Sequence, residues 1–147
     1  MHGMGIKVVT GNIYLGWIIG ESDAENIWLA GKVTGWAESV ETLTGVSRKH
    51  PQSAYAGLQK SLHQEWSFVQ QVTPSIGNTF GPVEKALRET FVPALFEGMG
   101  EGAPEQGVTH LSVKQAGLAL PDPTLTAPEN WAPYCVNTGH LVASLRG

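Results

Sequence analysis

The apolar residues between Ser22 and Val72 recur every three or four positions, and this spacing is the strongest constraint on the fold. A helix places such residues on one stripe, whereas a strand would alternate them between two faces. Pro51 interrupts the stretch because it lacks an N–H and disfavours helical backbone at His50, yet it suits the first position of a new helix. The pattern therefore predicts two long amphipathic helices that meet at Pro51 and end before Pro74.

The same stripe predicts part of the core and the start of the first helix. Ser22-Asp23-Ala24-Glu25 is a capping-box pattern, in which the Ser22 hydroxyl accepts from the amide of residue 25 and the Glu25 side chain reaches back. We expect four large stripe residues to be buried between the two helices: Trp36, Leu58, Leu62 and Trp66.

A β-hairpin is expected before the helices. Residues 6–10 and 13–19 are rich in β-branched and aromatic side chains. Gly11-Asn12 lies between them and can adopt the positive φ angles of a two-residue turn. The sequence therefore predicts a hairpin within residues 1–20, with its turn at Gly11-Asn12.

The second half of the chain predicts two further helices and a short β element. A third helix is expected to begin at Gly81-Pro82 and to kink or end at Pro93. The polar, glycine-rich segment 98–107 is typical of a flexible loop, and the alternating residues 108–113 favour a strand. A second capping-box pattern at 126–129 predicts a helix at the C-terminal end.

These predictions give a mainly α fold of the α+β class, as a single domain or a fragment. At 147 residues the chain is long enough to bury a substantial core. It begins in a strand-like segment and ends in a helix-like one, which favours a fragment of a longer protein. The expected parts are a hairpin (1–20), a helical region (22–97), a flexible loop (98–107), and a short β element with the C-terminal helix (108–147).

Composition and charge exclude several classes of function. The hydrophobic content of 41% and the charged content of 15% indicate a globular chain. The formal net charge of −4 argues against free-standing binding to nucleic acid. Cys135 is the only cysteine, which excludes an internal disulfide and a cysteine-based zinc site. Without a signal-peptide pattern or an apolar run of ~20 residues, we expect an intracellular protein with no membrane span.

No arrangement of residues in the sequence predicts catalysis. His63 and Glu65 match part of a zinc-deaminase signature, but the Pro-Cys-x-x-Cys that completes it is missing. Cys135 and His140 are five positions apart on a predicted helix, so their side chains diverge. We therefore expect no catalytic residue, no metal site and no cofactor.

Positive or chargeable side chains are concentrated on either side of Pro51. A cluster of this kind can neutralise the phosphates of a nucleic acid, or it can simply solvate a helix end. Both alternatives stay open at this point. The members of the cluster are Arg48, Lys49, His50, Lys60 and His63.

Several segments resemble reverse transcriptases of eukaryotic retroelements. Tyr14-Leu15-Gly16, in the predicted second strand and followed by a long helix, resembles the primer-grip hairpin at the end of the palm domain. Residues 51–66 and 81–96 are similar to the helical region that follows the palm. Residues 116–123 resemble a proline-ended segment found further along in such open reading frames.

This resemblance implies a non-catalytic, thumb-side part of such an enzyme. Polymerisation needs paired carboxylates that hold two metal ions, and the only aspartates here are Asp23 and Asp122. The implied partners are a primer–template duplex and the missing palm domain. The alternative is a helical module that binds another protein through incompletely covered apolar stripes. The expected nucleic-acid contacts are Tyr14, Leu15, Gly16, Arg48, Lys49 and Lys60.

Overall fold

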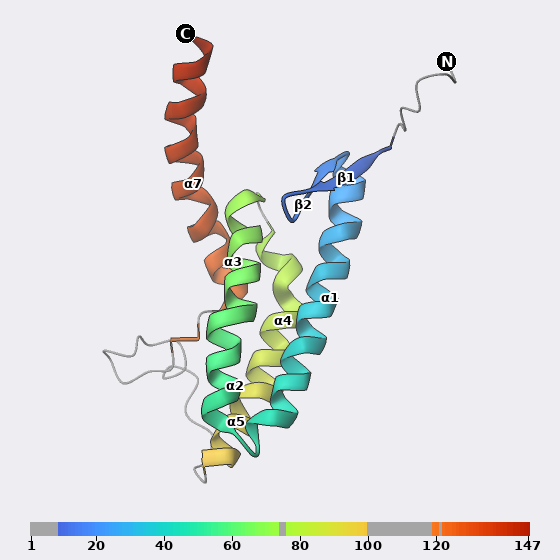
Figure 1. Cartoon of the computed structure of the whole chain (residues 1–147), viewed down its shortest axis with the longest axis vertical. Helices are drawn as coiled ribbons and strands as arrows, with labels where there is room; N and C mark the ends of the chain where they lie inside the picture. The colour runs from blue at the N-terminus through green and yellow to red at the C-terminus, as the bar shows by residue number, and fades with distance from the viewer. Residues whose placement is uncertain (1–8, 74–75, 100–118, 121) are drawn as a thin grey trace.

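The computed structural model describes residues 9–73, 76–99, 119–120 and 122–147, and it shows a mainly α-helical fold with an N-terminal hairpin (Figure 1). The predicted strand at 108–113 and loop residues 100–107 lie outside this range. The elements are β1 (Gly11–Tyr14), β2 (Trp17–Gly20), α1 (Ser22–Ser47), α2 (Pro51–Gly57), η1 (Leu58–Leu62), α3 (His63–Val72), η2 (Gly77–Phe80), α4 (Gly81–Ala86), η3 (Leu87–Phe91), α5 (Val92–Met99) and α7 (Pro123–Arg146).

The hairpin turns at Leu15-Gly16, so the predicted turn at Gly11-Asn12 was wrong. Leu15 and Gly16 both have positive φ angles, 50° and 82°, as a two-residue turn between twisted strands requires. Gly11 instead pairs with Gly20. A Cβ on Gly20 would lie 2.3 Å from the Thr10 carbonyl oxygen, so this close pairing requires glycine. Gly11, which suggested a turn, therefore lies in a strand and pairs closely with Gly20.

The prediction of two long helices that meet at Pro51 is confirmed. α1 ends at Ser47, and Pro51 begins a continuous helical rod formed by α2, η1 and α3. The capping box at the start of α1 is not formed, because the N-cap position is Glu21 and carries no side-chain cap. The Glu21 amide donates to the Thr10 carbonyl, which ties the helix start to the hairpin and places Ser22 inside the helix.

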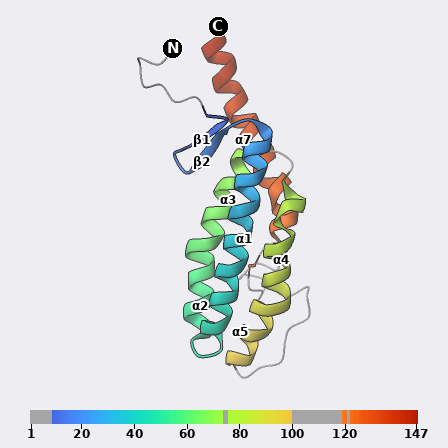
Figure 2. The same ribbon diagram turned by 90° about the vertical axis from the view of Figure 1, so that its right-hand side faces the viewer.

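α1 is the first rod of the fold, and α2, η1 and α3 together are the second. The third rod is formed by η2, α4, η3 and α5, and it packs against α1 and α2 to give a three-helix bundle (Figures 1 and 2). The helix begins at Gly81 as predicted, but it continues past Pro93 to Met99. The segment η3, which ends at Phe91, two residues before Pro93, is a π-helical turn. This wider turn accommodates the proline, which has no N–H to offer a preceding carbonyl.

The core lies between the three rods. Trp36, Leu58 and Trp66 are buried as predicted. Leu62 was predicted to be buried as well, but it is only half-buried at the edge of the core. It ends the π-helical segment η1, whose i→i+5 spacing moves the stripe off the line that a regular α-helix would follow. The other large buried side chains include Phe80, Phe91 and Leu95.

The C-terminal helix α7 starts four residues earlier than predicted, since its N-cap is Asp122 and not Thr126. The side-chain oxygen of Asp122 accepts from the Thr124 amide at 2.8 Å, so the capping box at 126–129 is not used. The first turns of α7 pack on α3 and η2, and Pro123 and Ala127 are buried there. Beyond them α7 extends past the end of the bundle (Figure 1).

Candidate functional site

The Tyr14-Leu15-Gly16 signature forms the exposed tip of the hairpin and does not lie within the second strand as predicted. Tyr14 ends β1, and Leu15, in the turn, is 82% exposed. The tip borders an open groove of about 550 Å³ between the hairpin, α1 and α3. The remaining lining residues are Trp28, Lys32, Trp36, Glu65, Phe68 and Val69.

The groove has aromatic walls with one positive and one negative group. The Lys32 ammonium nitrogen lies 5.6 Å from the centre of the Trp28 ring, and Trp17 packs edge-on against that ring at 4.9 Å. The Trp36 indole N–H donates to a Glu65 carboxylate oxygen at 3.0 Å. Trp28, which is only partly buried and lies beside Lys32, is suited to contact a base and its phosphate, whereas Trp36 is buried in the core. The sequence prediction missed this groove, although the spacing of Trp28, Lys32 and Trp36 already places them on one face of α1.

The predicted basic cluster is weaker in the structure than in the sequence. The Arg48 guanidinium lies 3.6 Å from the Glu97 carboxylate, and Glu41 and Glu89 line the same surface groove. His63 is half-buried, and this burial lowers the pKa of its imidazole below the ordinary value, so the ring favours its neutral form. Within the described segments, Lys49 and Lys60 are exposed and form no ion pair. These two lysines are the part of the cluster best able to contact phosphate.

The hairpin tip and the basic cluster do not form one compact site. The tip lies beside Lys32, whereas Arg48 follows the end of α1, about 24 Å further along the helix axis. Lys60 lies on the neighbouring rod, in η1. One turn of a nucleic-acid duplex is about 34–36 Å long, so a duplex lying along the bundle could reach both groups.

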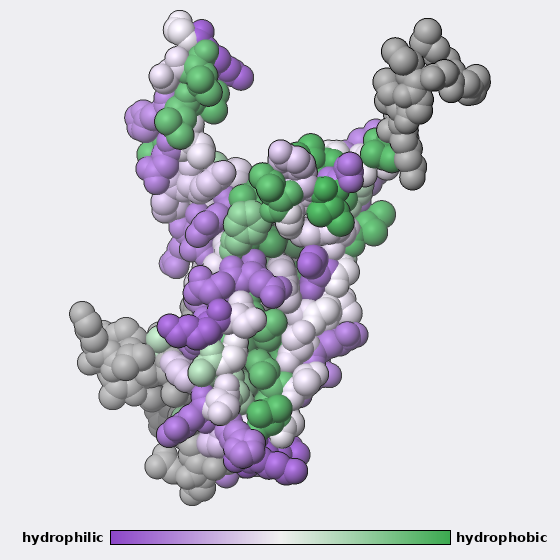
Figure 3. Space-filling model, viewed as in Figure 1, coloured by the Kyte–Doolittle hydropathy of each residue, from purple (hydrophilic) through white to green (hydrophobic). Residues whose placement is uncertain are grey.

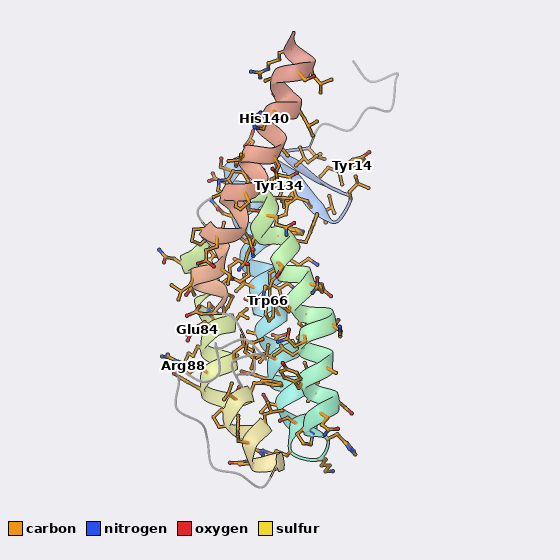
Figure 4. The ribbon with its side chains drawn as sticks, turned by 90° about the vertical axis from the view of Figure 1, so that its left-hand side faces the viewer. Tyr14, Trp66, Glu84, Arg88, Tyr134 and His140 are labelled. Atoms are coloured by element: carbon orange, nitrogen blue, oxygen red, sulfur yellow. The ribbon has the colours of Figure 1, made fainter. Side chains whose placement is uncertain are left out.

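The third rod offers little free positive charge. Arg88 contacts Glu84 at 3.2 Å, a pair labelled in Figure 4, and Lys85 lies 4.0 Å from Glu89. These pairs are one turn apart on an exposed helix surface, where they contribute only a few tenths of a kcal/mol. They leave the α1 and η1 surfaces as the better candidates for a nucleic-acid contact.

The described residues contain no group of three or more histidine, cysteine, aspartate or glutamate side chains that could hold a metal ion. Asp23 lies in the first turn of α1 and Asp122 caps α7. Cys135 and His140 lie on α7 beyond its packed first turns. In the part of the chain that the structure covers, no helix combines the length and apolar character needed to cross a lipid bilayer.

Comparisons with protein-family models, curated proteins and solved structures found no match. The resemblance to reverse transcriptases therefore stays a prediction, based on the residues that carry it.

Proposed function

We propose that this chain is the primer-grip hairpin and thumb-side bundle of a reverse-transcriptase-like protein, and that it contacts nucleic acid without catalysing polymerisation. The observation that supports this best is the position of Tyr14-Leu15-Gly16. The signature stands at the exposed tip of a hairpin that leads into α1 after a single residue, Glu21. A tip in this position can contact the end of a primer strand, while the helices contact the backbone of the nucleic-acid duplex behind it.

The hairpin packs against the start of α1. Ile18 of β2 is buried, and a Cβ on Gly11 would lie 3.2 Å from the Ala24 side chain in α1. The Glu21 amide closes the junction through its hydrogen bond to Thr10. A two-stranded hairpin is marginal by itself, so these contacts with α1 stabilise it.

We expect weak, sequence-independent binding of a primer–template duplex by the isolated chain. Two or three lysine contacts predict that log affinity falls with log salt at a slope of about −2 to −3, because each neutralised phosphate releases counterions. Lys60→Ala should reduce the magnitude of the slope by about one unit and leave the fold intact, since Lys60 is exposed. Fluorescence anisotropy of a labelled duplex between about 20 and 200 mM salt is the measurement.

The matched control is Lys85→Ala on the third rod, where the lysine lies beside Glu89. This change should leave the slope as it is. Absence of binding at the lowest salt, or equal effects of the two substitutions, would contradict a contact at η1.

A second candidate function is a helical module that binds protein. One specific observation favours it: apolar side chains on the part of α7 beyond the bundle are exposed, including Leu141, Val142 and Leu145. Apolar side chains that gather on one exposed surface commonly mark an interaction site.

A further inference from the structure

The apolar stripe that packs α7 onto the bundle continues beyond it. Pro123 and Ala127 are buried where α7 meets α3 and η2. Helical spacing places later residues on the same side of α7, where Leu141 is 65% and Leu145 is 88% exposed. The stripe beyond the bundle consists of Trp131, Tyr134, Cys135, Thr138, Leu141, Val142 and Leu145. We call it the distal stripe. Within it, Trp131, Tyr134, Thr138, Leu141 and Leu145 are separated by alternating steps of three and four residues, as the a and d positions of a coiled coil are.

The part of α7 that carries the distal stripe has an unusual composition for an exposed helix. Residues 130–145 contain no aspartate, glutamate, lysine or arginine, but they do contain Pro133 and Gly139. Both residues weaken a helix in water. An isolated helix of this length is marginal even with favourable residues, and most helices are stabilised by packing of an apolar face. This segment therefore needs a covering surface.

A buried polar contact fixes the direction in which this segment leaves the bundle. The Gln70 side chain is fully buried in α3, and its amide N–H donates to the Pro123 carbonyl at 2.7 Å. Its carbonyl oxygen accepts from Asn130 at 2.8 Å and from Thr126 at 3.2 Å. α7 is thus held to α3 as far as Asn130, and the distal stripe begins at the next residue.

The hairpin presents a second uncharged apolar surface at the same end of the molecule. Residues 11–20 contain no charged side chain, and Ile13 and Ile19 are exposed. Figure 4 shows Tyr134 on α7 and Tyr14 on the hairpin at this end of the molecule. In the space-filling view, the end of α7 stands clear of the hairpin, with apolar side chains on both (Figure 3).

We propose that the distal stripe binds a second copy of this chain, so that two α7 helices pack against each other in a symmetric dimer. This inference rests on the interaction function proposed above and names its partner. A two-fold axis brings the same stripe from both copies together, so the partner surface is apolar, uncharged and of equal length by construction. No charged residue between 130 and 145 requires a counter-charge from a different protein.

The size of the contact indicates how the dimer is completed. Sixteen helical residues are about 24 Å long, and one such helix pair is short of the roughly 1,200 Å² that stable specific interfaces bury. The exposed apolar side chains of the hairpin lie at the same end and extend the available surface. Contacts between α7 of one copy and Ile13 and Ile19 of the other would supply the missing area and leave the hairpin tip free.

Sedimentation velocity of the whole chain over about 1–200 µM tests this proposal. The wild type should dimerise as concentration rises, and Leu141→Asp should raise the dissociation constant more than about tenfold because it buries a charge in the interface. Val136→Asp is the matched control, since Val136 is 63% exposed on the opposite side of the same helix. This control should dimerise like the wild type. Leu145→Asp serves as a second test variant if Leu141→Asp fails to show a native circular-dichroism spectrum.

The outcomes separate this inference from the interaction function on which it rests. A chain that stays monomeric up to about 200 µM, a concentration at which even weak dimers form, contradicts a second copy as the partner. A dimer that Leu141→Asp and Leu145→Asp leave intact overturns it as well. If the monomer binds an apolar fluorescent dye and Leu141→Asp removes that binding, the exposed stripe and the interaction function stand. If the monomer binds no dye, both the dimer and the protein-binding function of α7 are contradicted.

Discussion

Trp66→Ala should lower the free energy of unfolding by about 3–5 kcal/mol, because it removes a large side chain from the centre of the bundle. Trp66 is 1% exposed, and its ring lies 6.5 Å from that of Trp36 and 5.8 Å from that of His63. The loss is a large part of the 5–15 kcal/mol that domains typically have. Urea denaturation followed by circular dichroism measures it.

Two further variants make the result specific. Leu62→Ala changes a half-buried residue on the same rod and should cost less than about 2 kcal/mol, the lower end for fully buried leucines. Trp66→Phe keeps an aromatic ring and removes an indole N–H that has no hydrogen-bond partner within the described segments, so it should cost less than Trp66→Ala. Equal losses for Leu62→Ala and Trp66→Ala would show that the core is centred elsewhere.

Gln70→Leu should loosen α7 from the bundle. The substitution keeps a side chain of similar size but leaves the Pro123 carbonyl and the Asn130 amide without the partners that Gln70 supplies. Buried groups deprived of a partner cost about 1–3 kcal/mol each. Hydrogen exchange should accelerate at the backbone amides of the non-proline residues between 124 and 134, while the amides of α1 stay protected.

The neighbouring Gln71→Leu is the control, since Gln71 is exposed and the substitution is chemically identical. It should leave α7 protected. If Gln70→Leu and Gln71→Leu give the same exchange pattern, then Gln70 does not hold α7 in place, and the direction of the distal stripe has another cause.

The helices were predictable from the sequence because their signals are local. The stripe and Pro51 defined α1 and the following rod almost to the residue. The hairpin register was not predictable from the sequence, because the turn at Leu15-Gly16 places a leucine at positive φ. The close pairing of Gly11 with Gly20 and the packing of β2 against α1 stabilise that arrangement, and both depend on tertiary structure.

The candidate site was predictable only in part. The Tyr14-Leu15-Gly16 signature is exposed, which a nucleic-acid contact requires. The basic cluster was overestimated, because the carboxylate beside Arg48 comes from Glu97 on another rod. The pattern of α7 indicated an amphipathic helix, but periodicity does not tell whether the surface that covers it belongs to the same chain.

The central claim is that the hairpin tip and the lysines of the bundle contact nucleic acid together. An NMR titration of the isotope-labelled chain with a primer–template duplex at about 20 mM salt tests it most directly, because counterion release makes such contacts strongest at low salt. The proposal predicts amide shift changes at Tyr14, Leu15 and Gly16 and around Lys60, with α7 residues 130–145 unaffected. No shift changes at the tip, or changes confined to α7, would contradict it.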